Sequence, residues 1–201
     1  MNTNPDIHLE MQGSVAVVRL TRPTKRNALN DGLIASLRHI FENLPKEARA
    51  AVVAGEGEHF CAGLDLSELK ERDAGEGVYH SRSWHVALDR VQSGPVPVIA
   101  ALHGAVVGGG LELASACHIR VADESTFYAL PEGTRGIFVG GGGAVRIPRL
   151  IGVARMTDMM LTGRVYNATE GERIGLSQYV VPNGQALSKA LELARRIRSE
   201  E

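Results

Sequence analysis

The chain has 201 residues, of which 44% are hydrophobic and 22% charged, and its formal net charge is −1. These values are typical of a soluble globular protein with one domain, and they argue against a nucleic-acid partner, which usually requires a basic excess. No apolar run approaches the roughly 20 residues that span a bilayer, so we expect no membrane partner. The polar N-terminus lacks the features of a secretory signal, and two cysteines are too few for a disulfide framework, so we expect a cytoplasmic protein.

Strands and helices alternate along the chain. Residues 7–11 and 14–20 are predicted to form two strands, and Asn30 can cap a helix whose apolar residues recur at helical spacing. Further strands are expected at 50–54, 97–102, 119–122, 126–129 and 178–181, and further helices at 78–91, 111–117, 144–150, 154–161, 169–174 and 185–198. This alternation predicts an α/β fold with covered sheets, in one domain over 1–201 with its core at about 7–182.

The first of two glycine clusters, Gly108 to Gly110, joins a predicted buried strand to a predicted helix. Glycines at such a junction leave backbone N–H groups uncovered, and the helix dipole adds partial positive charge there. Glu112 follows three residues after Gly109, on the same face of the first helical turn. A carboxylate beside an oxyanion-binding site is suited to moving a proton next to a carbonyl group. The alternative is that Glu112 only balances the helix dipole.

A second carboxylate, Glu132, follows Pro131 and precedes the second glycine cluster, Gly140 to Gly143. Proline restricts the backbone, which suits a rigid loop that aims a side chain. Taken alone, Glu132 is better explained as a solvated glutamate in a turn. The combination of both carboxylates with both glycine clusters favours a catalytic pair.

Four motifs appear in the order and at the spacing of the crotonase (enoyl-CoA hydratase/isomerase) superfamily, which the chain resembles from about Ser14 onward. The motifs are RPTKRNAL at 22–29, FCAGLDL at 60–66, GGGLELA at 108–114, and LPE at 130–132 followed by glycines at 140–143 and Arg146. The resemblance implies an α/β fold of the ClpP/crotonase type, a spiral of ββα units. It also implies a shortened C-terminal helical part, because family chains usually continue beyond the closing helix at 185–198. The chain is either naturally short or truncated.

The resemblance also assigns roles to individual residues. Glu112 and Glu132 would be the acid/base pair, the backbone N–H groups of Leu64 and Gly109 would form an oxyanion hole for a thioester carbonyl, and the Gly140 amide would help to hold the catalytic water. The residues expected to contact coenzyme A are Lys25, Arg26, Ala28, Ala62, Asp65, Leu66 and Ser67. The residues expected to line the acyl pocket are Trp84, Leu88 and Leu130, although Trp84 could equally be a core residue.

The presence of both glutamates favours a hydratase, which adds water across the double bond of a 2-enoyl-CoA. The alternatives are an acyl-CoA thioester hydrolase or an enoyl-CoA isomerase at the same site, and a non-catalytic CoA-binding or interaction module. The expected partner is an acyl-CoA thioester, with no metal or cofactor besides the coenzyme A of the substrate, and the expected assembly is a homotrimer or a dimer of trimers. His118 stands where many relatives have Asp, and we expect it to be a buried histidine with its hydrogen bonds satisfied.

Overall fold

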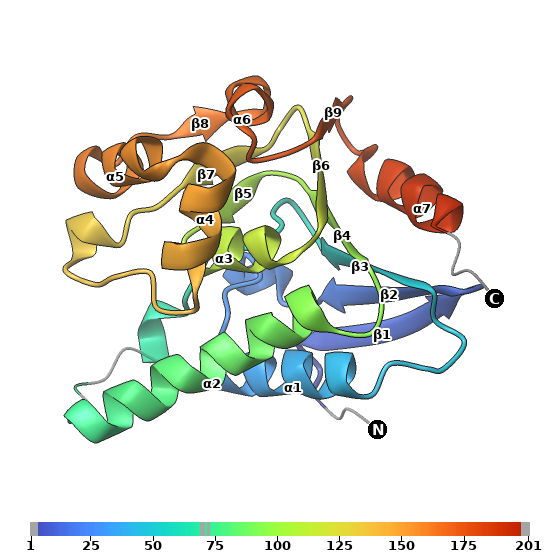
Figure 1. Ribbon diagram of the computed structural model, residues 1–201, viewed down its shortest axis with the longest axis horizontal. Helices are drawn as coiled ribbons and strands as arrows, with labels where there is room; N and C mark the ends of the chain where they lie inside the picture. Colours follow the sequence, from blue (N-terminus) through green and yellow to red (C-terminus); the bar gives the residue numbers. More distant parts are fainter. Residues whose placement is uncertain (1–3, 69–70, 72, 198–201) are drawn as a thin grey trace.

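Six strands form the larger sheet of the computed structural model, which describes residues 4–68, 71 and 73–197 (Figure 1). Their order is β1–β2–β3–β4–β6–β9, with bounds β1 (Ile7–Gln12), β2 (Val15–Leu20), β3 (Ala50–Gly55), β4 (Val98–Leu102), β6 (Ile119–Asp123) and β9 (Tyr179–Val181). β1 pairs antiparallel with β2, and every other neighbouring pair is parallel. The parallel strands β3 and β4 are almost wholly buried, which explains why both are continuous apolar runs in the sequence.

A second sheet of three short strands lies beside the first. It has the order β5 (Ala105–Val107), β7 (Phe127–Ala129) and β8 (Tyr166–Asn167), with β5 parallel to β7 and β8 antiparallel to it. A single parallel bridge from Cys61 to Val106 adds one more extended segment to this layer.

The helices of the described residues are α1 (Asp31–Glu42), α2 (Ala74–Ser93), α3 (Gly109–Ala116), α4 (Gly143–Ile151), α5 (Val153–Thr162), α6 (Ala168–Ile174) and α7 (Ala186–Arg196), with short 3₁₀ helices η1 (Pro23–Lys25), η2 (Leu66–Glu68) and η3 (Gly133–Arg135). Successive units therefore repeat one pattern: a strand of the larger sheet, an extended segment of the smaller layer, then a helix. β4, β5 and α3 form one such unit, and β6, β7 and α4 form another, in which residues 130–142 connect β7 to α4. This repeat confirms the expected ββα architecture.

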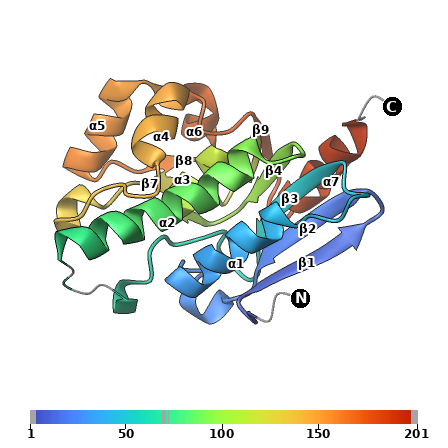
Figure 2. The ribbon, with the colours of Figure 1, turned by 60° about the horizontal axis from the view of Figure 1, so that its bottom comes forward.

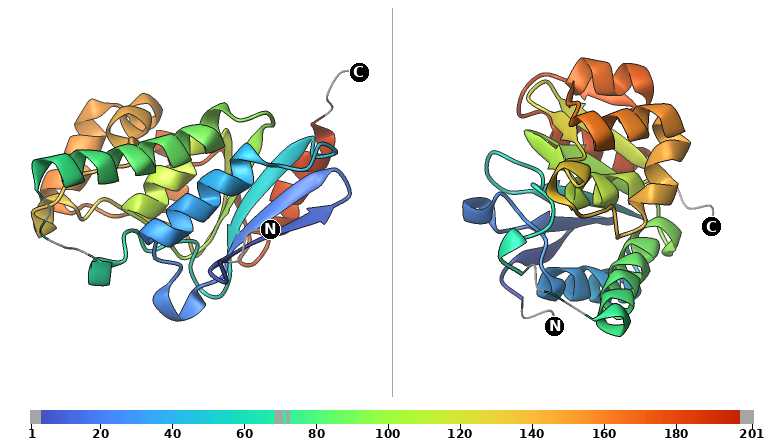
Figure 3. Two further views of the ribbon diagram at one scale, coloured as in Figure 1. Left: turned by 90° about the horizontal axis from the view of Figure 1, so that it is seen from below. Right: turned by 90° about the vertical axis from the view of Figure 1, so that its left-hand side faces the viewer.

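The two faces of the larger sheet pack against different helices. Alternate residues of β2 face opposite sides, as the strand period requires: Ala16 and Val18 pack in the main core, and Val15 and Val17 pack in a second core. α1 and α2 run side by side on the main-core side (Figure 2), and α7 covers the other face (Figure 3). None of the helices in the described part of the chain is long and apolar enough to cross a membrane.

Most expected elements are confirmed within a few residues, and the N-cap is confirmed because the Asn30 side chain accepts a hydrogen bond from the Leu33 amide at 2.7 Å. α2 begins earlier than expected, because Asp73 caps it by accepting from the Glu76 amide. α7 ends at Arg196, and residue 198 lies outside the described residues. β5 and β8 were not predicted, since strands of three and two residues have too few positions to show a pattern.

The environment of His118 differs from the expectation. The residue is exposed rather than buried, and its Nδ1 accepts a hydrogen bond from the Val98 amide at 3.0 Å. His118 therefore accepts a hydrogen bond from the first residue of β4 at the surface, where its imidazole can remain in contact with water.

Close packing of α3 against the smaller layer gives a test of the fold. A Cβ atom on Gly110 would lie 2.3 Å from the carbonyl oxygen of Cys61, whereas a Cβ on Gly77 in α2 would have no neighbour within 4 Å. We therefore expect Gly110→Ala to lower the free energy of unfolding by about 1–3 kcal/mol. The matched variant Gly77→Ala should leave it unchanged or raise it by up to about 1 kcal/mol, because alanine favours helix. Urea unfolding measures both, and equal effects would contradict this packing.

Candidate active site

A cavity of about 550 Å³ lies between α2, the start of α3 and the chain that follows Glu132. This volume is in the range of small-molecule sites in proteins. Its lining combines the two predicted acids with small and apolar residues: Leu64, Gly77, His80, Ser81, Trp84, Gly109, Glu112, Glu132, Gly136, Ile137, Phe138, Gly140 and Gly141. The structure thus brings Leu64, Gly109 and both glutamates, which are far apart in the sequence, to one site.

The carboxyl group of Glu112 is buried in the first turn of α3 and is held by backbone. Its Oε1 accepts hydrogen bonds from the amides of Gly141 at 2.7 Å and Gly143 at 2.8 Å. The pKa of Glu112 is raised to about 7, mainly because burial disfavours the charged form, while the two amides limit the rise. The nearby charge of Glu132 raises it as well. Glu112 can therefore gain or lose a proton near neutral pH.

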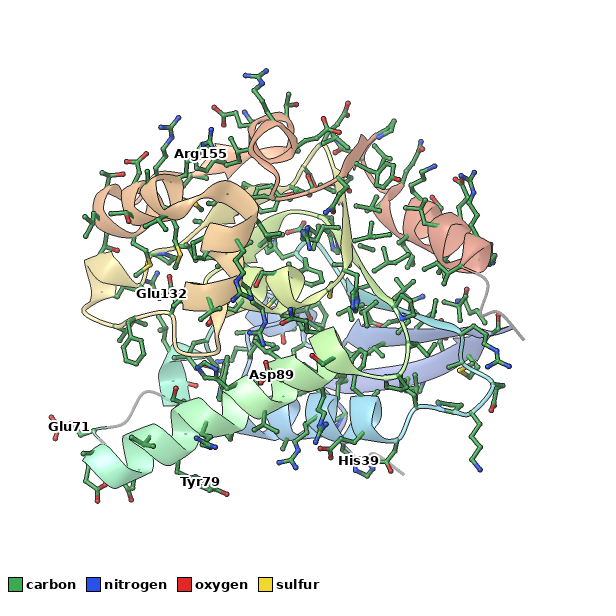
Figure 4. All side chains as sticks on the ribbon, in the orientation of Figure 1. His39, Glu71, Tyr79, Asp89, Glu132 and Arg155 are labelled. Atoms are coloured by element: carbon green, nitrogen blue, oxygen red, sulfur yellow. The ribbon has the colours of Figure 1, made fainter. Side chains whose placement is uncertain are left out.

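Glu132 is also buried, but its carboxyl group has fewer hydrogen-bond donors. It packs against Gly108, where an added Cβ would lie 2.7 Å from Oε1 of Glu132. Its Oε2 is buried and has no hydrogen-bond partner within the described residues. Burial raises the pKa of Glu132 above its ordinary value, because it disfavours the charged form. Figure 4 labels Glu132 between α3 and η3.

Two backbone amides at the cavity lack an acceptor in the part of the chain that the structure describes. The amides of Leu64 and Gly109 donate no hydrogen bond to any group in residues 4–68, 71 and 73–197. The two segments are adjacent, since a Cβ on Gly109 would lie 3.6 Å from the Leu64 nitrogen and a Cβ on Gly63 would lie 3.4 Å from the Gly109 nitrogen. Gly109 is the first residue of α3, so the helix dipole adds positive potential there. The pair can bind an oxygen that carries negative charge.

The second glycine cluster forms the turn that meets Glu112. A Cβ on Gly143 would lie 2.6 Å from Cγ of Glu112, and Gly142 has φ +97°, a conformation that favours glycine. Gly140, the expected water-holding residue, lines the cavity, and its carbonyl oxygen accepts a hydrogen bond from Ser81 Oγ at 2.9 Å. The amides that reach Glu112 are those of Gly141 and Gly143, and a role for the Gly140 amide in holding water stays a prediction.

The residues expected to contact coenzyme A have different environments. Lys25, Arg26, Leu66 and Ser67 are exposed, Ala62 is partly exposed, and Ala28 and Asp65 are buried. The Asp65 side chain differs from the expectation: Oδ2 pairs with Arg22 at 3.0 Å, and Oδ1 accepts from the Ser67 hydroxyl at 2.7 Å. Its carboxylate is therefore already engaged within the protein. Contacts between the other residues and coenzyme A stay predictions.

Two motif residues that we did not interpret prove to be structural. Asn27 is fully buried with φ +54°, accepts from the Arg22 amide at 2.9 Å, and donates to the carbonyl of His59 at 2.7 Å. Arg22 donates to the carbonyl of Ala28 at 2.8 Å as well as to Asp65. These bonds join segment 22–28 to segment 59–65, which carries Leu64. No local sequence pattern reveals the bonds from Arg22 to Asp65 and from Asn27 to His59, because their partners are 43 and 32 positions apart.

Of the three residues expected at the acyl pocket, the structure places one on the cavity wall. Trp84 lines the cavity, and its Nε1 donates to Asp31 at 3.1 Å. Leu88 and Leu130 are fully buried in the core and are not among the lining residues. We missed His80 and Ser81, although their helical spacing from Trp84 puts them on the same face of α2.

The searched part of the chain, residues 4–68, 71 and 73–197, contains no group of three or more His, Cys, Asp or Glu side chains arranged to hold a metal ion.

The raised pKa of Glu112 predicts a pH-dependent effect on stability. Because the folded state holds the proton more tightly than the unfolded chain, the free energy of unfolding should fall as pH rises from about 4.5 to about 7. Glu112→Gln removes this penalty, so the variant should be more stable than the parent protein at pH 8 by about 1–3 kcal/mol. The difference should shrink at pH 5. Urea unfolding at both pH values measures it, with the exposed Glu47→Gln as control. A variant less stable at pH 8 than at pH 5, relative to the parent, would contradict the raised pKa.

Comparison with known proteins shows which family the chain is similar to. The enoyl-CoA hydratase/isomerase family profile matches residues 10–201. Enoyl-CoA hydratase EchA19 of Mycobacterium tuberculosis is 34% identical over 202 residues, which cover 98% of this chain and 76% of the relative.

Solved structures show the same relationship. A Rhodopseudomonas palustris protein, provisionally named an enoyl-CoA hydratase, is 62% identical with a TM-score of 0.94, over 96% of this chain and 76% of its own. A Thermobifida fusca protein with the same provisional name, solved in complex with acetoacetyl-CoA, is 26% identical with a TM-score of 0.87, over 96% of this chain and 80% of its own. A shared fold, matching sequence over nearly the whole chain and two acids beside free amides lead to one conclusion: the chain belongs to the enoyl-CoA hydratase/isomerase family of the crotonase superfamily.

Proposed function

We propose that the protein is an enoyl-CoA hydratase that adds water across the double bond of a 2-enoyl-CoA. The observation that carries the proposal is the placement of two buried carboxyl groups and two unpaired amides around one cavity. Hydration needs a base for water, an acid for the α carbon and a site for the charge that develops on the thioester oxygen. The cavity supplies one group of the right kind for each need.

The amides of Leu64 and Gly109 would bind the thioester carbonyl oxygen. When hydroxide adds to the β carbon, electron density moves through the α carbon to this oxygen and makes it enolate-like. Hydrogen bonds that strengthen as charge develops lower the barrier, by about 3 kcal/mol for a well-placed donor. This stabilisation serves any reaction that passes through an enolate or a tetrahedral oxyanion, so it does not distinguish hydration from isomerisation or hydrolysis.

The two glutamates would divide the proton transfers between them. Two amides donate to Glu112, which favours its ionised form, and Glu132 lacks a donor to Oε2, which favours its neutral form. Glu112 would accept a proton from water as the hydroxide bonds to the β carbon, and Glu132 would give its proton to the α carbon. The pair begins and ends with one shared proton, which passes back to Glu132 before the next turnover.

The substrate would reach this site as a coenzyme A thioester. The Thermobifida fusca relative was solved with acetoacetyl-CoA, and this chain shares its fold. Lys25 and Arg26 are adjacent exposed cations next to the segment that carries Leu64, since the Arg26 carbonyl accepts from the Ala62 amide at 2.9 Å. They can pair with the phosphates of coenzyme A. The expected homotrimer or dimer of trimers and the cytoplasmic location stay predictions.

The first test is turnover of crotonyl-CoA. We expect loss of the absorbance of the conjugated thioester, and a decrease in kcat of about 10²–10⁴-fold in both Glu112→Gln and Glu132→Gln, since each removes one proton-transfer group. Unchanged turnover in either variant would contradict the mechanism. Release of free CoA, detected with a thiol reagent, would instead indicate a thioester hydrolase. Conversion of a 3-enoyl-CoA to the 2-enoyl isomer without hydration would indicate an isomerase, and binding without turnover a non-catalytic module.

The second test is the pH dependence of kcat/KM. Because the pKa of Glu112 is raised to about 7, the ionised base should be lost as pH falls through 7, and kcat/KM should fall with it. At high pH the pair of glutamates loses its last proton and none remains for the α carbon, so the rate should fall again and the profile should be bell-shaped. A profile that is flat between pH 5 and 7 would contradict the assignment of Glu112 as the base.

A further inference from the structure

A buried arginine lies directly behind the turn that holds Glu112. Arg146, in the first half of α4, is 7% exposed and takes no part in lining the cavity. Its guanidinium is engaged on three sides: Nε donates to Gln92 Oε1 at 2.7 Å, Nη1 donates to the carbonyl of Gly141 at 3.0 Å, and Nη2 pairs with Asp89. Burying a cation costs free energy unless its hydrogen bonds are satisfied, so this placement calls for a reason.

Arg146 also fills the space beneath the turn. A Cβ on Gly142 would lie 2.3 Å from Nη1 of Arg146, so the guanidinium occupies the position where a side chain would project. The amides on either side of Gly142, those of Gly141 and Gly143, both donate to Oε1 of Glu112. The guanidinium and the carboxyl of Glu112 are therefore both held by the backbone of Gly141, whose carbonyl accepts from Arg146 and whose amide donates to Glu112.

We propose that Arg146 is a positioning residue that favours the negative charge on Glu112, the base of the catalytic pair. It would act in two ways: by holding the Gly141 carbonyl so that both glycine amides stay directed at Glu112, and by its own positive charge behind the turn. This inference rests on the proposed function for its kinetic consequences, but the charge on Glu112 can be measured whatever the reaction.

Charged and titratable groups around Glu112 come from three directions. Glu132 follows β7, Arg146 is on α4, and α2 contributes Asp89 and His85, whose Nδ1 would lie 3.2 Å from a Cβ on Gly142. β5, which also packs against α3, consists of Ala105–Val107 and has no titratable group. Arg146 lowers the pKa of Glu112, and Glu132 raises it. Asp89, the ion-pair partner of Arg146, carries the opposite charge, and Figure 4 labels it on α2.

These opposed charges allow a test by sign. Arg146→Gln should raise the pKa of Glu112 and therefore move the acid limb of the kcat/KM profile to higher pH by about one unit. At pH 7 it should lower kcat about 10–100-fold, with little change in KM. Arg146→Lys keeps the charge but loses the forked geometry, so it should restore most of the limb's position while kcat stays reduced. Asp89→Asn, at an exposed site, should move the limb slightly to lower pH. Arg149→Gln, an exposed arginine on the same helix, is the matched control and should leave the profile unchanged.

A purely structural role for Arg146 predicts something different. Arg146→Gln would then lower the amount of folded protein, or lower kcat equally at every pH, and the acid limb of kcat/KM would not move. Asp89→Asn would not shift that limb to lower pH. Either result would overturn the proposal. The pKa of Glu112, read from the carboxyl signal of ¹³C-labelled glutamate by NMR and assigned with Glu112→Gln, gives the same test without turnover. If the parent protein does not hydrate enoyl-CoAs but the NMR shifts appear, the proposed function fails and the positioning role stands. If Arg146→Gln does not fold, the pH profiles of Asp89→Asn and Arg146→Lys still test the proposal.

Discussion

The hydrogen bonds from the amides of Gly141 and Gly143 to Glu112 constrain much of the surrounding chain. A carboxyl group can be held this way only if the backbone comes within hydrogen-bond distance of it, which excludes side chains from the turn. A Cβ on Gly143 would contact Glu112, and one on Gly108 would contact Glu132. The high glycine content of the chain thus follows in part from the close approach of backbone to two acids.

Opposing effects hold the pKa of Glu112 at about 7. Burial disfavours its charge, the amides and Arg146 favour it, and Glu132 opposes it. No single one of these effects explains a carboxyl group that is half ionised near pH 7. The balance among all of them explains it. The arrangement costs stability, because a buried ionised carboxyl group is less favourable than an amide of the same shape. A site that must both accept and release protons retains that cost.

The motifs that mark the family serve two purposes. Glu112, Glu132 and Gly109 line the cavity, whereas Arg22, Asn27 and Asp65 bond to one another or to backbone and hold segments 22–28 and 59–65 together. Leu64, with its unpaired amide, lies in the second of these segments. The position of that amide therefore depends on polar contacts that never reach the substrate.

The alternation of most strands and helices and the two candidate acids could be predicted from the sequence, because hydrophobic periodicity, capping at Asn30 and glycine-rich junctions are local signals. The ββα repeat was expected only from the resemblance to the family. Motif order then brought Leu64 into the prediction. The remaining features could be seen only in the tertiary structure. They are the hydrogen bonds from the amides of Gly141 and Gly143 to Glu112, and the contact of the Arg146 guanidinium with the Gly141 carbonyl. They also include the bond between Arg22 and Asp65 and the full burial of Leu88 and Leu130. Each of these is a contact between residues distant in sequence, whose existence depends on how the helices pack on the sheets, and no local pattern encodes that packing.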